Sequence, residues 1–104
     1  MSRLTDKEGI YDQEIINNII RSMEAYPSAV FLDVGAHMGS FTVVIAAMKR
    51  RVIAVDADPK NLAYIKQSLD IAKTTDYVEL IYNAIRWVIK LDKSKFIGTS
   101  LELK

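Results

Sequence analysis

Residues 29–39 read Ala-Val-Phe-Leu-Asp-Val-Gly-Ala-His-Met-Gly, and this stretch decides the fold. Its first six residues form an apolar run without alternation, which is typical of a strand buried on both faces of a parallel sheet. Gly35 stops that run, and a second glycine follows at Gly39. Because glycine permits a sharp turn and close approach to the main chain, we expect a strand, a tight loop and then a helix.

The segments around this loop alternate between helix and strand patterns. Residues 12–26 carry isoleucines at helical spacing, with Asp12 as the expected N-cap and Pro27 as the stop. Asp58 and Pro59 mark the start of a later helix, since Asp is a good N-cap and Pro suits the first helical position. The predicted elements, in chain order, are a helix over 12–26, a strand near 29–34, a helix over 40–50, a strand near 51–56, a helix from 59 and a strand near 77–82.

This alternation predicts an α/β, Rossmann-like fold with right-handed crossovers and three parallel strands in the order 3-2-1. The remaining residues alternate between apolar and polar from Ile85 to Leu91, which favours a hairpin with a second arm over 95–103. No fourth parallel strand is expected from the pattern. We therefore predict that residues 1–104 form a partial domain, truncated after its third parallel strand.

Composition limits the classes of function. Half of the 104 residues are apolar and the formal net charge is +1, so we expect one globular domain with no binding to nucleic acid or membrane. There is no cysteine and only one histidine, so no metal site is expected. The charged start, residues 1–8, is unlike a signal peptide, and we expect a cytoplasmic protein. The basic cluster Lys49–Arg51 is interpreted as a solvated helix end.

Two phosphate-binding motifs fit the loop poorly. The dinucleotide fingerprint needs three glycines, and its positions here hold Gly35, His37 and Ser40. A P-loop needs a lysine directly after its last glycine, but Gly39 is followed by Ser40. A nicotinamide-dependent oxidoreductase is therefore the less favoured enzymatic alternative.

A different nucleoside ligand fits better. Asp56 ends the second predicted strand, 21 residues after Gly35, and a carboxylate there can accept hydrogen bonds from ribose hydroxyls. Asp33 ends the first strand, where it can meet a cationic amine. S-adenosylmethionine carries a ribose and an amine but no phosphate, so the sequence favours it as the cofactor.

The segments Asp33–Gly39, Phe41-Thr42 and Val55–Pro59 together resemble the FkbM family of methyltransferases, over residues from about 11 to 84. The resemblance implies O-methylation of a hydroxyl on a small molecule or glycan. It also implies cofactor-binding roles for residues in three regions. These are Asp33, Gly35, Ala36, His37 and Gly39 around the methionine portion, Asp56 at the ribose and Asn83 at the adenine edge.

The chain departs from the family pattern in three places. Asp56 stands where glutamate is more usual, and Ala57 stands where the family often has proline. The family's sheet has seven strands, and the strands that would carry catalytic groups have no counterpart in the predicted elements. No catalytic residue is assigned.

A non-catalytic half-domain is the main alternative. Without a fourth strand, the first strand would be an apolar sheet edge, which favours pairing with another chain. The C-terminal segment, a second copy in a homodimer or a different partner could cover that edge. Such a chain would bind the cofactor weakly or need its partner to bind it.

Overall fold

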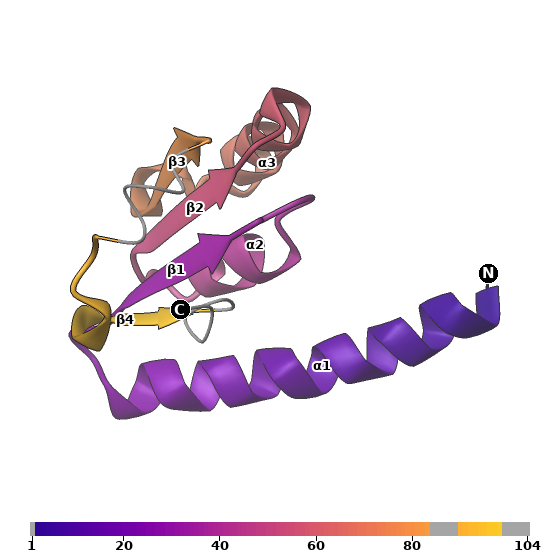
Figure 1. The fold of residues 1–104 in the computed structure, drawn as a ribbon, viewed down its shortest axis with the longest axis horizontal. Coiled ribbons are helices and arrows are strands. Elements are labelled where there is room, and N and C mark those ends of the chain that lie inside the picture. Colours follow the sequence, from indigo (N-terminus) through magenta and orange to yellow (C-terminus); the bar gives the residue numbers. More distant parts are fainter. Residues whose placement is uncertain (1, 84–89, 99–104) are drawn as a thin grey trace.

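The computed structural model describes residues 2–83 and 90–98 (Figure 1). The elements are α1 (Ser2–Ala25), β1 (Val30–Val34), α2 (Ser40–Ala47), β2 (Val52–Asp56), α3 (Pro59–Ala72), β3 (Val78–Tyr82) and β4 (Phe96–Gly98), with short 3₁₀ turns at Thr75–Tyr77 and Lys93–Lys95. Within these residues, no helix combines the length and apolar character needed to cross a membrane.

The four strands form one parallel sheet in the order β3-β2-β1-β4. Phe31 of β1 lies opposite Val52 of β2 on one side and Ile97 of β4 on the other. The strand order reverses at β1, because β2 and β3 extend the sheet in one direction and β4 in the other. Ligands of open α/β sheets bind at such a switch point, outside the carboxyl ends of the strands. The predicted α/β class and the 3-2-1 order are confirmed.

The prediction that the sheet stops after three strands is wrong. Residues 96–98, expected in the second arm of a hairpin, form β4 and run parallel to β1. Most of the first arm, 85–91, lies outside the described residues. A strand of three residues is too short to show a period, so the sequence pattern could not reveal it. Among the described strands, β1 is therefore interior, and β3 and β4 lie at the two edges of the sheet.

Helix α1 begins ten residues before the predicted start at 12, so Asp12 is not its N-cap. The apolar spacing marks the part of the helix in which Ile19 and Met23 are buried in the core. Figure 1 shows the first turns of α1 lying away from the sheet. The helix ends at Ala25, one residue before the predicted end at 26 and two before Pro27.

The core has a part on each face of the sheet. On one face, buried side chains from all three helices pack with alternate residues of β1 and β2, among them Met23, Ile45, Ile65 and Phe31. On the other face, Leu32 and Val55 form a smaller cluster. Because successive residues of a strand point to opposite faces, the unbroken apolar runs of β1 and β2 supply both parts.

Arg50 joins α1 to the start of β1. Its guanidinium donates to the carbonyl oxygens of Met23 (2.6 Å), Tyr26 (2.9 Å) and Ala29 (3.1 Å). The last carbonyl oxygens of a helix have no hydrogen-bond donors within the helix. Arg50 provides donors for Met23, in the last turn of α1, and for Tyr26 and Ala29, which follow it. The interpretation of this residue as part of a solvated helix end is therefore wrong, because three carbonyls from a distant part of the sequence surround it.

Arg50→Ala should lower the free energy of unfolding by about 1.5–3 kcal/mol, the range for hydrogen bonds that involve a charged group. The neighbouring Arg51 is exposed, and Arg51→Ala should change stability by less than about 0.5 kcal/mol. Urea denaturation of both variants measures the difference. Equal effects would contradict the structural role of Arg50.

Candidate functional site

The predicted site residues meet at one edge of the sheet. Parallel strands place their carboxyl ends together, so the loop 35–39 after β1, Asp56 at the end of β2 and Asn83 after β3 lie along the same edge. The backbone N–H of Asn83 donates to the carbonyl oxygen of Asp56 (2.8 Å), which joins the ends of β2 and β3. Asn83 has a positive φ of 52° and is exposed.

The loop 35–39 is held against β2 by main-chain contacts. The N–H groups of Gly35 and Ala36 both donate to the carbonyl oxygen of Val55, at 2.8 and 3.1 Å. Gly35 has φ 72° and Gly39 has φ 84°, both in the left-handed region that favours glycine. A Cβ on Gly39 would lie 2.8 Å from Cγ1 of Ile65, so α3 packs where any side chain at position 39 would be.

His37 connects this loop to Asp56. Its φ is 56°, and its backbone N–H donates to Asp56 Oδ2 at 2.7 Å. The side chain of His37 is exposed, as is that of Met38. In this structure His37 therefore shapes the loop through its main chain, and the tip of the loop presents two side chains to solvent.

The carboxylate of Asp56 is the centre of the hydrogen-bond network. Only 6% of the residue is exposed, and Oδ1 accepts from the Asp58 N–H (2.8 Å) and from Asn61 Nδ2 (3.2 Å). Burial acts to raise the pKa of Asp56, but the hydrogen bonds from Asp58, His37 and Asn61 outweigh it and lower the pKa below 3.8. Asp56 is therefore a fixed, ionised acceptor at neutral pH.

Asp33 lies inside the protein, beneath the loop. It is 2% exposed, and its Oδ2 accepts a hydrogen bond from the hydroxyl of Thr42 in α2 (2.6 Å). This contact fixes the end of β1 against the first turns of α2. The predicted contact of Asp33 with a ligand amine stays a prediction.

Thr42→Val should lower the free energy of unfolding by about 1.5–3 kcal/mol, because a buried carboxylate loses a donor while the shape of the side chain is kept. Thr42→Ser keeps the hydroxyl and loses one methyl group, so a smaller loss of about 1 kcal/mol is expected. Chemical denaturation at pH 7 compares the two variants. A serine variant less stable than the valine variant would contradict a stabilising Thr42–Asp33 hydrogen bond.

Two contributors to the site were missed in the sequence. Asn61 was not singled out, although it stands three residues after the N-cap Asp58, in the first turn of α3. Asp58 was expected only as a helix cap, and its side chain does accept a hydrogen bond from the Lys60 N–H (2.9 Å). Its own backbone N–H, however, also donates to the carboxylate of Asp56. The Asp-x-Asp-Pro-x-Asn spacing is a signal that could have found both.

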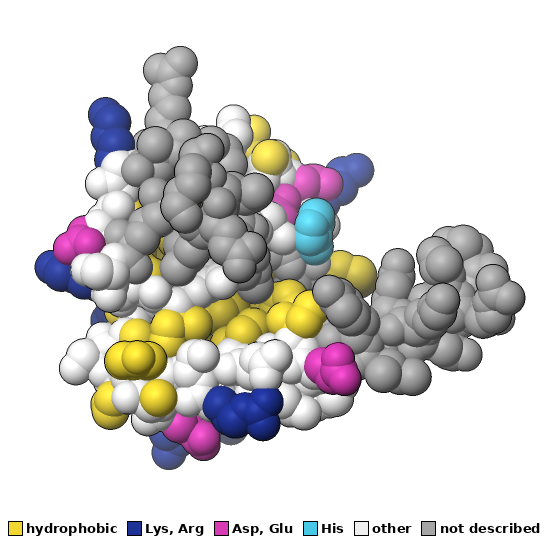
Figure 2. Space-filling view, turned by 60° about the horizontal axis from the view of Figure 1, so that its bottom comes forward, with side chains coloured by type: hydrophobic (Ala, Val, Ile, Leu, Met, Phe, Trp, Pro, Cys, Tyr) yellow, Lys and Arg dark blue, Asp and Glu magenta, His cyan; other side chains and the backbone are white. Residues whose placement is uncertain are grey.

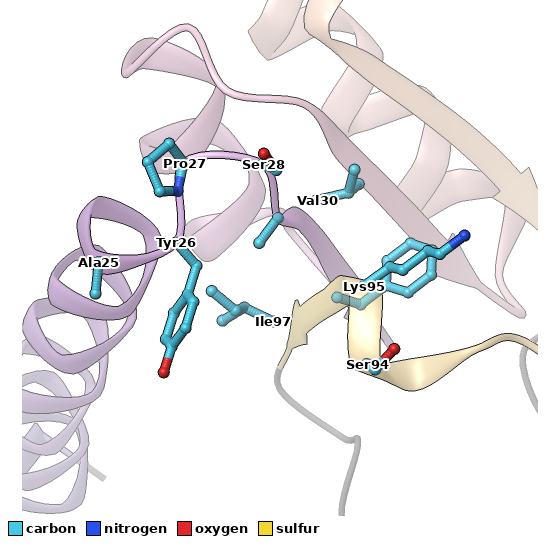
Figure 3. Close-up of a pocket in the computed structure, with 10 residues that line it drawn as sticks. Ala25, Tyr26, Pro27, Ser28, Val30, Ser94, Lys95 and Ile97 are labelled. Carbon is cyan, nitrogen blue, oxygen red and sulfur yellow. The ribbon is translucent and has the colours of Figure 1, made fainter.

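A large hollow lies away from this site. It has a volume of about 710 Å³ and opens at the amino ends of β1 and β4, the edge of the sheet opposite Asp56 (Figure 3). Its walls are the end of α1 and residues 26–30 on one side and residues 94–97 on the other. Figure 2 shows a band of hydrophobic side chains running alongside α1. The hollow does not share a residue with the candidate site.

Comparison with known proteins gives no match to any family model. A probable cobalt-precorrin-6B C(15)-methyltransferase (decarboxylating) of Methanobrevibacter smithii is 31% identical over 94 residues, covering 82% of this chain and 50% of that protein. A probable ribosomal RNA small subunit methyltransferase A of Methanosarcina mazei is 26% identical over 73 residues, covering 70% of this chain and 27% of that protein. The chain thus spans half or less of the length of these curated relatives.

Among solved structures, an RNA methyltransferase from Salinibacter ruber in complex with S-adenosyl-L-homocysteine superposes with a TM-score of 0.63. The identity is 16%, and the match covers 82% of this chain and 56% of that one, so it shows the fold alone. The chain resembles class I S-adenosylmethionine-dependent methyltransferases. These relatives are ribosomal RNA and cobalt-precorrin enzymes, and they give no support to the FkbM family in particular.

Proposed function

We propose that this chain binds S-adenosylmethionine at the carboxyl edge of its sheet and serves in methyl transfer. One observation carries the proposal: the His37 N–H contacts Asp56 Oδ2 at 2.7 Å. This contact brings together the glycine loop and the acidic strand end, the two parts expected to hold one nucleoside ligand. The resemblance to methyltransferases supports the same choice of cofactor.

The residues present suit this ligand. Asp56 is a buried, ionised acceptor for ribose hydroxyls, and a carboxylate edge favours a ligand with hydroxyl and amine donors over one with phosphates. Gly35 is exposed and has no Cβ, so it leaves the loop backbone open to close approach by a ligand, whereas Gly39 lets α3 pack beneath the loop. Asn83, joined to Asp56 through the main chain, is the residue that we assign to the adenine edge.

Bound S-adenosylmethionine supplies a methyl group already activated by its sulfonium. The chain's part is to bind and orient: the loop fixes one end of the ligand and Asp56 fixes the ribose. For the acceptor we propose a hydroxyl of a small molecule or glycan, on the basis of the motif resemblance to FkbM enzymes. No residue is assigned to catalysis at the acceptor.

A specific observation favours a second candidate, a binding half-domain that works with a partner chain. Among the described strands, β4 lies at an edge of the sheet, next to the apolar hollow. A partner strand could pair with β4 at that edge and extend the sheet. Light scattering over a range of protein concentrations tests this: association supports the partner, and a monomer at all concentrations speaks against self-pairing.

Amide NMR spectra recorded during titration with S-adenosylhomocysteine test the cofactor site directly. We expect saturable shifts at Gly35, His37, Gly39 and Asp58, and none at Ile97 beside the distant hollow. Titration with NADH serves as the matched comparison and should leave these amides unshifted. Shifts confined to the hollow, or a stronger response to NADH, would overturn the proposal.

A further inference from the structure

The acceptor capacity of Asp56 is almost used up within the protein. A carboxylate offers about four lone-pair positions, two on each oxygen. Three donors from the described part of the chain reach it: the His37 N–H on Oδ2, and the Asp58 N–H and Asn61 Nδ2 on Oδ1. Oδ1 therefore already carries two donors and Oδ2 carries one.

A ribose diol needs more than the one position that these contacts leave. Its two hydroxyls can both donate to a carboxylate only if two lone-pair positions are open. One is left on Oδ2, and the second must come from Oδ1. A donor on Oδ1 therefore has to leave when a diol binds in this way.

The three donors differ in how easily they can leave. Those of His37 and Asp58 are main-chain groups fixed by the loop and by the turn into α3, so moving them means moving the backbone. Asn61 donates from a side chain, at 3.2 Å, the longest of the three distances. The residue is half-buried, in the first turn of α3, and its amide can rotate without any change of the main chain.

We propose that Asn61 is a positioning residue for ribose recognition: it holds the Asp56 carboxylate in the free protein and gives up its place on Oδ1 to a ribose hydroxyl. This inference rests on the proposed function, since it assumes a ligand with a vicinal diol at Asp56. Asn61 then competes with the ligand for Oδ1. The free energy needed to displace the Asn61 amide lowers the affinity of the protein for a ligand that carries both ribose hydroxyls.

The test is calorimetric titration of S-adenosylhomocysteine into the wild-type chain and the Asn61→Ala variant. The variant has no side-chain donor to displace, so it should bind about two- to tenfold more tightly, the fold-change that corresponds to one ordinary hydrogen bond. Analogues that lack the 2′- or the 3′-hydroxyl need only the open position on Oδ2. Their affinities should be the same for both proteins.

Gln67→Ala, an exposed amide on the same helix, is the control and should leave every affinity unchanged. Weaker or unchanged binding of S-adenosylhomocysteine by Asn61→Ala would overturn the inference, because a direct contact or a purely structural residue gives that result. Failure of the folded wild-type chain to bind would instead reject the proposed function, and the inference with it. In the free protein, loss of the Asn61 donor should also raise the pKa of Asp56, which carboxyl carbon NMR follows without any ligand.

Discussion

Gly39→Ala should destabilise the protein by about 2–5 kcal/mol, because two separate costs meet at this position. The left-handed φ of 84° disfavours any residue with a Cβ. The new Cβ would also lie 2.8 Å from Cγ1 of Ile65, a fully buried atom close to the α3 backbone that cannot swing aside. Urea denaturation measures the loss, and the displaced loop should also lose ligand binding.

Gly35→Ala is the matched control, since it separates these two costs. Its φ of 72° carries the same backbone penalty, but a Cβ there would meet only His37 Nε2 at an ordinary 3.8 Å. This variant should lose only about 1–2 kcal/mol. Equal losses for the two variants would mean that the close packing of α3 against the loop is not an important constraint.

Asp56→Asn should lower the free energy of unfolding by about 2–4 kcal/mol at pH 7, since it exchanges charge-assisted hydrogen bonds for weaker ones. The new NH₂ group also faces an N–H donor, from either His37 or Asp58. The exposed Asp76→Asn is the control and should change stability by less than about 0.5 kcal/mol.

The same variant should change the response to acid. The folded pKa of Asp56 is lowered, so its stabilisation is fully present above the unfolded value near 3.8 and is lost as the pH falls through the lower folded pKa. Below about pH 4 the wild-type chain should therefore lose stability more steeply than Asp56→Asn. Parallel curves for the two proteins would contradict the network around this carboxylate.

The three long parallel strands could be predicted because each is a short apolar run with a clear stop. Gly35 and Asp56 close the first two runs, and the observed bounds differ from the predicted ones by one residue at most. The start of α3 follows from local chemistry, because Asp58 caps it and Pro59 fits its first position. Local signals sufficed wherever the deciding contacts are close in sequence.

The features that were missed depend on contacts between distant residues. The strand β4 has only three residues, and pairing with β1 defines it rather than any period of its own. Arg50 is surrounded by carbonyls 21 to 27 residues earlier, so its sequence neighbours gave a misleading picture of a basic surface cluster. Residues 2–11 show no helical spacing of apolar residues in the sequence, and periodicity therefore placed the helix start too late.

The candidate site contains both features that the sequence predicts and features that depend on contacts between distant residues. The topology of a parallel sheet predicts that the loop after the first strand and Asp56 share an edge, and the His37–Asp56 contact joins them. The burial of Asp33 and its hydrogen bond to Thr42 depend on how α2 packs against β1. The sequence pattern does not specify that packing. The roles assigned to these residues in ligand binding stay predictions.

We propose above that this edge of the sheet is a working S-adenosylmethionine site centred on Asp56. Calorimetric titration of S-adenosylhomocysteine into the wild-type, Asp56→Asn and Asp76→Asn chains, each shown to be folded by circular dichroism, tests it most directly. We expect saturable one-to-one binding by the wild-type and Asp76→Asn chains, and affinity reduced by at least about 50-fold in Asp56→Asn. No binding by the folded wild-type chain, or equal affinity in all three, would contradict it.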